Sequence, residues 1–401
     1  MPALSRVGTA FFLNKPGGGG PPAEPGEAIF HADKGSQINT WDATTVYYWT
    51  VPEGVREISV VCIGGGGSGV SQHDGASGCG GGLAFKNQIA VTPGSTIEVS
   101  VGGGGGTAGW GNYGKKGDPS QITINGTLYA KAGGGNANHN GSYGNGLITN
   151  TGDGVPGGDF DGGGRGGEGA QQGGCRQSGG GCGGYQDDGD TSSNGGNAKG
   201  GDCGNQSYAG RWATDGHGGA GGGGYSENGS SSYYASGGGG TGIYGRAQNG
   251  IKGDNNQNQN ADSQVEWAGG GGSYSPWTDE TNGLTVTSYV HNTGVAGYSS
   301  NSDWSTFHTH DQQDLGNGYR RQDDTQGQGQ TRPDGGFPGG GGGGANSGSP
   351  CGFGGHGMVR IVWGTINSLP RRFPNQGVNK TDEYPGLSGA TIDVNGRQMM
   401  Y

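Results

Sequence analysis

A short motif with the spacing of metal ligands is His308-Thr309-His310-Asp311. On an extended strand alternate side chains share a face, so His308 and His310 would point to the same side, as a metal pair or an iron site requires. A lone H-x-H in a loop more often has no metal, because ligating histidines need further partners that position them. We therefore keep both histidines only as weak candidates, and we expect no metal and no cofactor.

Two glycine motifs resemble phosphate-binding loops. Gly64-x-Gly66-x-x-Gly69 follows an apolar segment, as a dinucleotide fingerprint does. That site needs a helix directly after the glycines, and the sequence that follows, VSQHDGASGCGGG, cannot start a stable one. Residues 109–115 approach a phosphate loop, but Lys116 stands where the magnesium-binding Ser or Thr would be. We attribute both motifs to chance in a glycine-rich chain.

No catalytic constellation is evident. There is no G-x-S-x-G motif, and no serine or cysteine lies in a context typical of a known triad. The acidic groups at residues 159–161 and 187–190 could offer oxygen ligands to calcium, but neither has EF-hand spacing, and solvated turn carboxylates are the simpler interpretation. We predict that the protein is not an enzyme.

Aromatic residues within polar segments suggest recognition instead. Rigid aromatic anchors among Ser, Asn and Gly suit adaptable binding of polar partners. The alternative is that these rings pack onto the scaffold, since exposed aromatics are the rarer case. The candidates are Tyr208, Trp212, Tyr233, Tyr234, Tyr274, Trp277, Tyr289, Tyr298, Trp304, Phe307 and Tyr319.

The composition restricts the scaffold that could hold such residues. Glycine supplies 104 of the 401 residues and apolar residues only 28%, too few for a conventional core of this size. Collagen is excluded because glycine does not recur at every third position. Plain disorder fits badly, since only 14% of residues are charged and 8% are aromatic. The net charge of −11 disfavours nucleic acid as a partner, and no apolar run is long enough to span a membrane.

Several segments are typical of β-strands. Residues 46–51, 57–63, 83–91, 96–101 and 358–363 are rich in β-branched and aromatic residues and are bounded by Pro and Gly. Asn125-Gly126, between residues 121–124 and 127–132, is a strong hairpin signal. We predict a small antiparallel β-sheet with essentially no α-helix. The six cysteines are too sparse for a disulfide scaffold, and we expect most to be small buried thiols.

Glycine runs dominate the rest of the chain. Packed side by side, polyglycine-II helices could hydrogen-bond to one another, because a residue without a Cβ lets backbones approach closely. We therefore predict four parts: an N-terminal arm (1–28), a β-rich domain (29–132), a polyglycine-II sandwich (133–357) with an insertion at 273–333, and a closing strand with a C-terminal tail (358–401). The apolar patch Phe11, Phe12 and Leu13 in the arm is a candidate for attachment to other subunits.

Four phrases resemble glycine-rich tail-fibre proteins of tailed bacteriophages, notably marine and cyanobacterial ones. They are WTVPEGVREISVVCIGGGG (49–67), GGGLAFKNQIAVTPGSTIEVSVGGGGG (80–106), GGGGTGIYGRAQNG (237–250) and GGHGMVRIVWG (354–364). Related long-tail-fibre adhesins of T-even-like phages form a polyglycine-II sandwich whose loops bind the host receptor. This chain departs from that pattern in its β-rich N-terminal part, its insertion and its C-terminal tail.

The resemblance implies a virion protein, located in the tail or tail fibre and assembled in the host cytoplasm. Its partners would be other virion tail proteins and a host cell-surface receptor, either a polysaccharide or an outer-membrane protein. A structural virion component, such as a fibre connector or decoration protein that docks through the arm and the tail, is an alternative. A glycine-rich extracellular domain of a cellular protein is another, but the sequence offers neither a signal peptide nor a disulfide pattern to support it.

Overall fold

The computed structural model describes residues 23–32, 44–69, 77–106, 114–137, 156–169, 179–189, 216–223, 237–246, 335–336, 338–343 and 351–378, with the paired residues 391–392 and 398–399. These residues form antiparallel β-sheets and irregular glycine-rich segments, and they contain no helix. Among them there is accordingly no helix long and apolar enough to cross a membrane.

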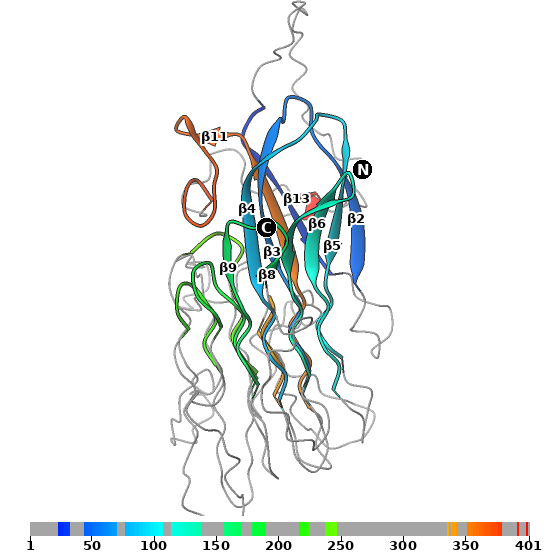
Figure 1. Cartoon of the computed structure of the whole chain (residues 1–401), viewed down its shortest axis with the longest axis vertical. Coiled ribbons are helices and arrows are strands. Elements are labelled where there is room, and N and C mark those ends of the chain that lie inside the picture. The colour runs from blue at the N-terminus through cyan, green and yellow to red at the C-terminus, as the bar shows by residue number, and fades with distance from the viewer. Residues whose placement is uncertain are drawn as a thin grey trace, which may run out of the picture.

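Two five-stranded antiparallel sheets form the upper half of the molecule in Figure 1. In the first sheet the order is β1 (Gly26–His31), β10 (Met358–Trp363), β3 (Glu57–Ile63), β4 (Leu83–Ala90) and β9 (Gly162–Gly164). In the second it is β2 (Thr45–Thr50), β5 (Thr96–Val101), β6 (Ser120–Ile124), β7 (Thr127–Ala132) and β8 (Pro156–Gly157). Two short hairpins follow: β11 (Thr365–Ile366) with β12 (Leu369–Pro370), and β13 (Thr391–Ile392) with β14 (Gln398–Met399).

The two sheets pack face to face around one hydrophobic core. Val60 and Cys62 of β3 meet Val99 of β5 and Ile122 of β6 there. Ring contacts also join the sheets: the centroids of Phe30 and Tyr47 lie 5.4 Å apart, and those of Trp49 and Trp363 lie 5.5 Å apart. The β-strands therefore form a sandwich, in which each sheet buries one face against the other.

The first sheet also buries its other face. Val61 of β3 and Val362 of β10 belong to a second core, which contains Tyr185, Tyr244 and Phe373 from segments outside the sheets. Burial on both faces explains why β3 and β10 are nearly continuous apolar runs, whereas in β2 exposed side chains alternate with buried or half-buried ones.

The predicted strands agree with the observed ones to within one residue at each end, and the predicted hairpin is β6–β7. Asn125 and Gly126 have φ of 49° and 77°, so both central residues are left-handed, as a type I′ turn requires. Strands β1, β8 and β9 of the two sheets were not predicted, and neither was the hairpin β11–β12. β1 begins at Gly26, inside the segment that we assigned to the arm.

Glycine runs continue from the strands into the lower half of Figure 1 and hydrogen-bond to one another. The N–H groups of residues 64–69 donate hydrogen bonds to three neighbouring segments, and the acceptor segment repeats every three residues. Gly64 and Gly67 donate to residues 79–82, Gly65 and Ser68 donate to residues 115–118, and Gly66 and Gly69 donate to residues 352–355. Carbonyl groups of the same run accept from three further segments, through the N–H groups of Gly105, Gly135 and Gly342. This run therefore has six hydrogen-bonded neighbours.

Close backbone packing leaves no room for side chains inside this bundle. A Cβ built on Gly66 would lie 2.0 Å from the carbonyl oxygen of Gly340. At the periphery only some positions face inward: in residues 114–117, Gly114 and Gly117 are buried while Lys115 and Lys116 are exposed. A three-residue period is the one that polyglycine-II helices would give. The assignment of these runs to that helix type stays a prediction.

Candidate functional site

The glycine runs share one end that lies away from the sheets, which we call the distal end. Hydrogen bonds show that three runs reach this end side by side, because Gly69 donates to Gly352, which itself donates to Gly343. From there residues 351–357 lead back to β10. The run that starts after β5 likewise ends at this level, at Gly106, whose carbonyl accepts a bond from the Ser68 hydroxyl. The chain thus leaves and re-enters the described bundle repeatedly at its distal end.

Five connecting segments have both of their attachment points at the distal end. Each lies between a run that descends from the sheets and a run that returns toward them. The segments are residues 70–76, 107–113, 170–178, 224–236 and 344–350. The topology therefore gathers the attachment points of five independent segments at one end of a scaffold held together by backbone hydrogen bonds.

The predicted site residues lie outside the described residues. This holds for the recognition candidates Tyr208, Trp212, Tyr233, Tyr234, Tyr274, Trp277, Tyr289, Tyr298, Trp304, Phe307 and Tyr319, for the attachment candidates Phe11, Phe12 and Leu13, and for His308 and His310. Tyr233 and Tyr234 belong to the segment 224–236, whose two attachment points are distal. All of these assignments stay predictions.

Two aromatic residues that open polar stretches after glycine runs are described, and both pack inside. Tyr185 and Tyr244 are almost completely buried in the second core. The Tyr185 hydroxyl donates to the carbonyl oxygen of Gly242 at 2.9 Å and accepts from the N–H of Gly245 at 3.1 Å. Burial raises the pKa of this hydroxyl, so it stays protonated. For these two rings, packing onto the scaffold is the observed role.

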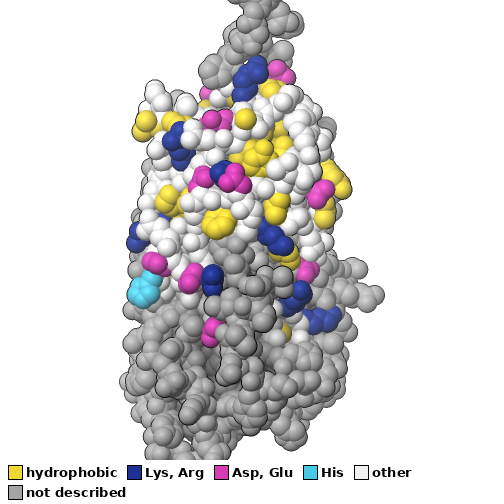
Figure 2. Space-filling view, viewed as in Figure 1, with side chains coloured by type: hydrophobic (Ala, Val, Ile, Leu, Met, Phe, Trp, Pro, Cys, Tyr) yellow, Lys and Arg dark blue, Asp and Glu magenta, His cyan; other side chains and the backbone are white. Residues whose placement is uncertain are grey.

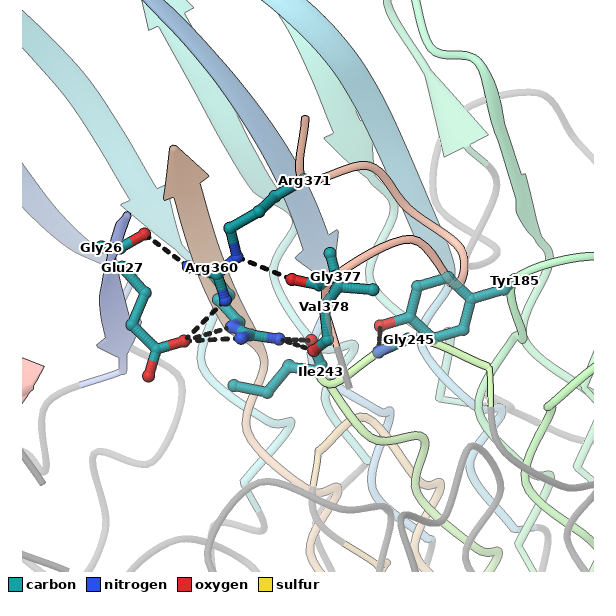
Figure 3. Close-up of polar contacts among 9 residues, drawn as sticks. All are labelled: Gly26, Glu27, Tyr185, Ile243, Gly245, Arg360, Arg371, Gly377 and Val378. Atoms are coloured by element: carbon teal, nitrogen blue, oxygen red, sulfur yellow. Dashed lines mark hydrogen bonds and ion pairs between the residues drawn. The ribbon is translucent and has the colours of Figure 1, made fainter. Parts of the chain in front are cut away.

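The most concentrated polar cluster surrounds Arg360, a fully buried residue of β10 (Figure 3). Its Nε and Nη2 both donate to Oε2 of Glu27 on β1, at 2.8 and 2.5 Å. Its Nη1 donates to the carbonyl oxygens of Ile243 and Val378, and its guanidinium carbon lies 4.2 Å from the centre of the Tyr244 ring. The guanidinium thus connects four segments that are distant in the sequence.

Arg371 extends this cluster toward the end of the sheets. Its Nε donates to the carbonyl oxygen of Gly377 and its Nη1 to that of Gly26, each at 2.7 Å, and its Nη2 lies 3.8 Å from Oε2 of Glu27. Burial opposes the charge of Arg360, but the Glu27 carboxylate together with Tyr244 and Tyr185 outweighs it, so the pKa of Arg360 lies above its ordinary value. The cluster is a structural connection between β1, β10 and residues 371–378.

A buried imidazole takes part in the glycine network. Nδ1 of His356 accepts the N–H of Gly104 at 2.9 Å, and its backbone carbonyl accepts the N–H of Gly339. The side chain therefore takes the place of a backbone acceptor for the N–H of Gly104. Sequence reasoning gave no role to Arg360, Arg371, Glu27 or His356, because their partners are far away along the chain.

The two acidic turns that could have offered calcium ligands bind protein groups. Lys86 pairs with Asp161 at 2.8 Å and with Asp159 at 3.3 Å, and Asp161 also accepts the N–H of Asn87. Asp188 accepts the N–H of Arg165 at 2.7 Å. Across the described part of the chain, no group of three His, Cys, Asp or Glu residues could hold a metal ion.

The described thiols are placed for packing rather than for reaction. Cys62, Cys182 and Cys351 are buried, as the sequence led us to expect. Burial raises the pKa of Cys62, and it raises the pKa of Cys182 to about 12, which keeps both thiols protonated near neutral pH. In the Gly64-x-Gly66-x-x-Gly69 motif, the three glycine N–H groups bond to backbone carbonyls of neighbouring segments.

The comparison with protein families agrees with this glycine-based architecture. A family model described as a glycine-rich domain matches residues 42–255, a range that includes every strand of the two sheets except β1 and β10 and most of the described glycine runs before residue 246. No curated protein sequence matches the chain. Since the match covers more than half of its 401 residues, the chain belongs to the glycine-rich domain family.

Proposed function

We propose that the protein is a tail-fibre or tail-tip adhesin in the virion of a tailed bacteriophage, and that it binds a host-cell surface receptor without catalysing a reaction. The observation that carries the proposal is the distal end, where five connecting segments attach to one scaffold. Segments on a rigid scaffold are where binding residues are most often found.

The way the scaffold is held together supports this function. The hydrogen bonds that join the described runs link mainly backbone atoms, and the contacts inside the bundle are between glycine backbones. Substitutions in the connecting segments would leave those contacts intact. A protein of this design can change its binding specificity without a matching change in its core.

The sequence phrases that resemble phage tail-fibre proteins fall on this same scaffold. The phrase at 49–67 covers the end of β2, all of β3 and the first part of the glycine run 64–69. The phrase at 354–364 covers the end of the run 351–357 and all of β10. The polar, aromatic-bearing segments between the phrases suit a polysaccharide or an outer-membrane protein as receptor.

A binding experiment on whole cells tests the proposal. Purified full-length protein, labelled with a fluorophore, is mixed with a panel of marine bacterial and cyanobacterial strains, and the bound fraction is measured by flow cytometry. We expect saturable binding to some strains, and loss of that binding when residues 224–236, the distal segment that contains Tyr233 and Tyr234, are replaced by a Gly-Ser linker of equal length.

The controls separate recognition from folding. The variant with the replaced segment 224–236 should melt cooperatively within about 3 °C of the wild type, since it keeps every described glycine run. Undiminished binding by that variant would exclude segment 224–236 as the receptor site. Absence of binding to every strain would refute the adhesin function and favour a fibre connector or decoration protein.

A further inference from the structure

Strand β2 lies at the edge of the second sheet, and no strand among the described residues pairs with its outer edge. Successive residues of an antiparallel strand direct their backbone groups to opposite sides. The N–H of Val51, directly after β2, donates to the carbonyl oxygen of Ser95, directly before β5. The backbone groups of Val46, Tyr48 and Thr50 therefore point away from β5, and the outer edge offers them to an added strand.

The other three edges of the sandwich carry features that protect edge strands. β8 has two residues, one of them Pro156, and β9 has three. β1 contains Glu27, and β13 lies beside it. Short length, proline, charge and cover all hinder the addition of another strand. β2 has none of these features, since its six residues include no proline and no charge and keep an unbroken register with β5.

Two apolar side chains project from β2 into solvent. Val46 and Tyr48 are 46% and 65% exposed, and Tyr48 is the most exposed large hydrophobic residue that the structure describes. Both lie on the outer face of the sheet, because Tyr47 between them packs into the core against Phe30. Figure 2 shows hydrophobic side chains at the right-hand border of the upper half, where Figure 1 places β2. An exposed apolar edge strand of this kind favours pairing with another chain.

The sequence of β2 is complementary to a second copy of itself. In an antiparallel pair centred on Tyr48, this residue would face its own counterpart, and Val46 would face Thr50 of the partner subunit. Tyr47 would face Trp49 of the partner subunit on the inner side. Aromatic and β-branched residues opposite one another stabilise antiparallel pairs. The same register also pairs the outward backbone groups of Val46, Tyr48 and Thr50, so it satisfies the whole outer edge.

This pairing also keeps charge repulsion and crowding low. The charged residue opposite Tyr48 on β5 is Glu98. Two Glu98 side chains would lie three strand spacings apart, about 14 Å, which exceeds the Debye length of about 8 Å at physiological salt. β2 runs away from the distal end, because it is antiparallel to β5, which leads to the run that ends at Gly106. Antiparallel pairing therefore directs the two distal ends away from each other.

We propose that the outer edge of β2 is a homodimer interface, through which two copies of the chain join their second sheets into one continuous antiparallel sheet. The inference goes beyond the proposed function and does not depend on it, because it requires neither a receptor nor a virion. A strand of six residues buries a small area, so the dimer forms at roughly micromolar concentrations.

Sedimentation velocity of the purified full-length protein, from about 1 to 100 µM, tests the interface. Tyr48→Lys and Tyr48→Glu each place like charges opposite one another across the two-fold axis. Leu369→Lys is the matched control, because it charges another exposed apolar residue, on the hairpin β11–β12. Thermal unfolding of each variant, followed by circular dichroism, checks the fold.

We expect the weight-average mass of the wild type to rise from 40.0 kDa toward twice that value over this range. Each Tyr48 variant should shift the midpoint to a concentration about tenfold higher or more, whereas Leu369→Lys should stay within about twofold of the wild type. All variants should melt within about 3 °C of the wild type. An equimolar mixture of Tyr48→Lys and Tyr48→Glu should dimerise more tightly than either variant alone, since opposite charges then face each other.

A wild type that keeps the mass of one chain up to about 100 µM would overturn the inference. Dimers that neither Tyr48 variant weakens would also overturn it, since they would use another surface. Equal weakening by Leu369→Lys would assign the association to non-specific apolar contact. A mixture no tighter than the single variants would refute the pairing centred on Tyr48. None of these outcomes would affect the proposed function, which the cell-binding experiment tests separately.

Discussion

Replacing Glu27 by glutamine should strongly destabilise the fold, because it removes the counter-charge of a fully buried arginine. Oε2 of Glu27 lies 2.8 Å from Nε of Arg360, and the exposed fractions of the Glu27 and Arg360 side chains are 18% and 0%. With the charges about 4 Å apart and an effective dielectric constant of about 20, the lost attraction is roughly 4 kcal/mol. The amide that replaces the carboxylate can still accept one hydrogen bond, which lowers the expected loss to about 2–4 kcal/mol.

Thermal unfolding followed by circular dichroism measures this loss. For a folded unit of this size, about 2–4 kcal/mol corresponds to a fall in melting temperature of roughly 5–15 °C. Glu57→Gln is the matched control, because Glu57 is an exposed residue at the start of the adjacent strand β3. Added salt should change the difference little, since a buried pair is poorly screened. A Glu27→Gln protein that melts within about 2 °C of the control would refute the reasoning.

Three further predictions concern the glycine bundle and its buried polar groups. Gly66→Ala should unfold the bundle or cost at least about 3 kcal/mol, because its Cβ would lie 2.0 Å from a backbone oxygen; Gly157→Ala, where the nearest atom would be 3.9 Å away, should melt like the wild type. The Cys182 thiol should resist alkylation at about pH 8 until denaturant is added. Because its pKa is raised to about 12, the folded state keeps a proton that the unfolded state loses, so stability should fall as the pH rises from about 9 toward 12, and a pH-independent melting temperature over that range would contradict this. Tyr185→Phe leaves a buried N–H and a buried carbonyl without their partner and should cost about 1–3 kcal/mol, measured by urea unfolding; a loss below about 0.5 kcal/mol would show that those groups find other partners.

Local sequence patterns predicted the strands well but not their arrangement. The segment MVRIVW was predicted as a strand, yet its place inside the first sheet, between β1 and β3, depends on pairing with residues far earlier in the chain. The role of Arg360 in this strand could not be predicted, because it depends on Glu27, which the fold places on the neighbouring strand β1.

The candidate site divides in a similar way. Recurrent glycine runs separated by polar segments predicted a scaffold with connecting segments, and the structure shows that five of these segments attach at one end. The hairpin β11–β12 could not be predicted, because its turn residues Asn367 and Ser368 do not include the glycine that is typical of such a turn. Sequence reasoning therefore succeeded where composition sets the architecture and failed where one long-range contact decides it.

The backbone-packed runs also bear on how stability should vary with temperature. Unfolding exposes mainly peptide groups in that half of the protein, and exposed polar surface lowers the heat capacity whereas exposed apolar surface raises it. The heat-capacity change per residue should therefore fall below the usual value of about 12–15 cal/mol/K. A small heat-capacity change flattens the stability curve, so cooling would weaken this fold less than it weakens a protein that relies on apolar side chains.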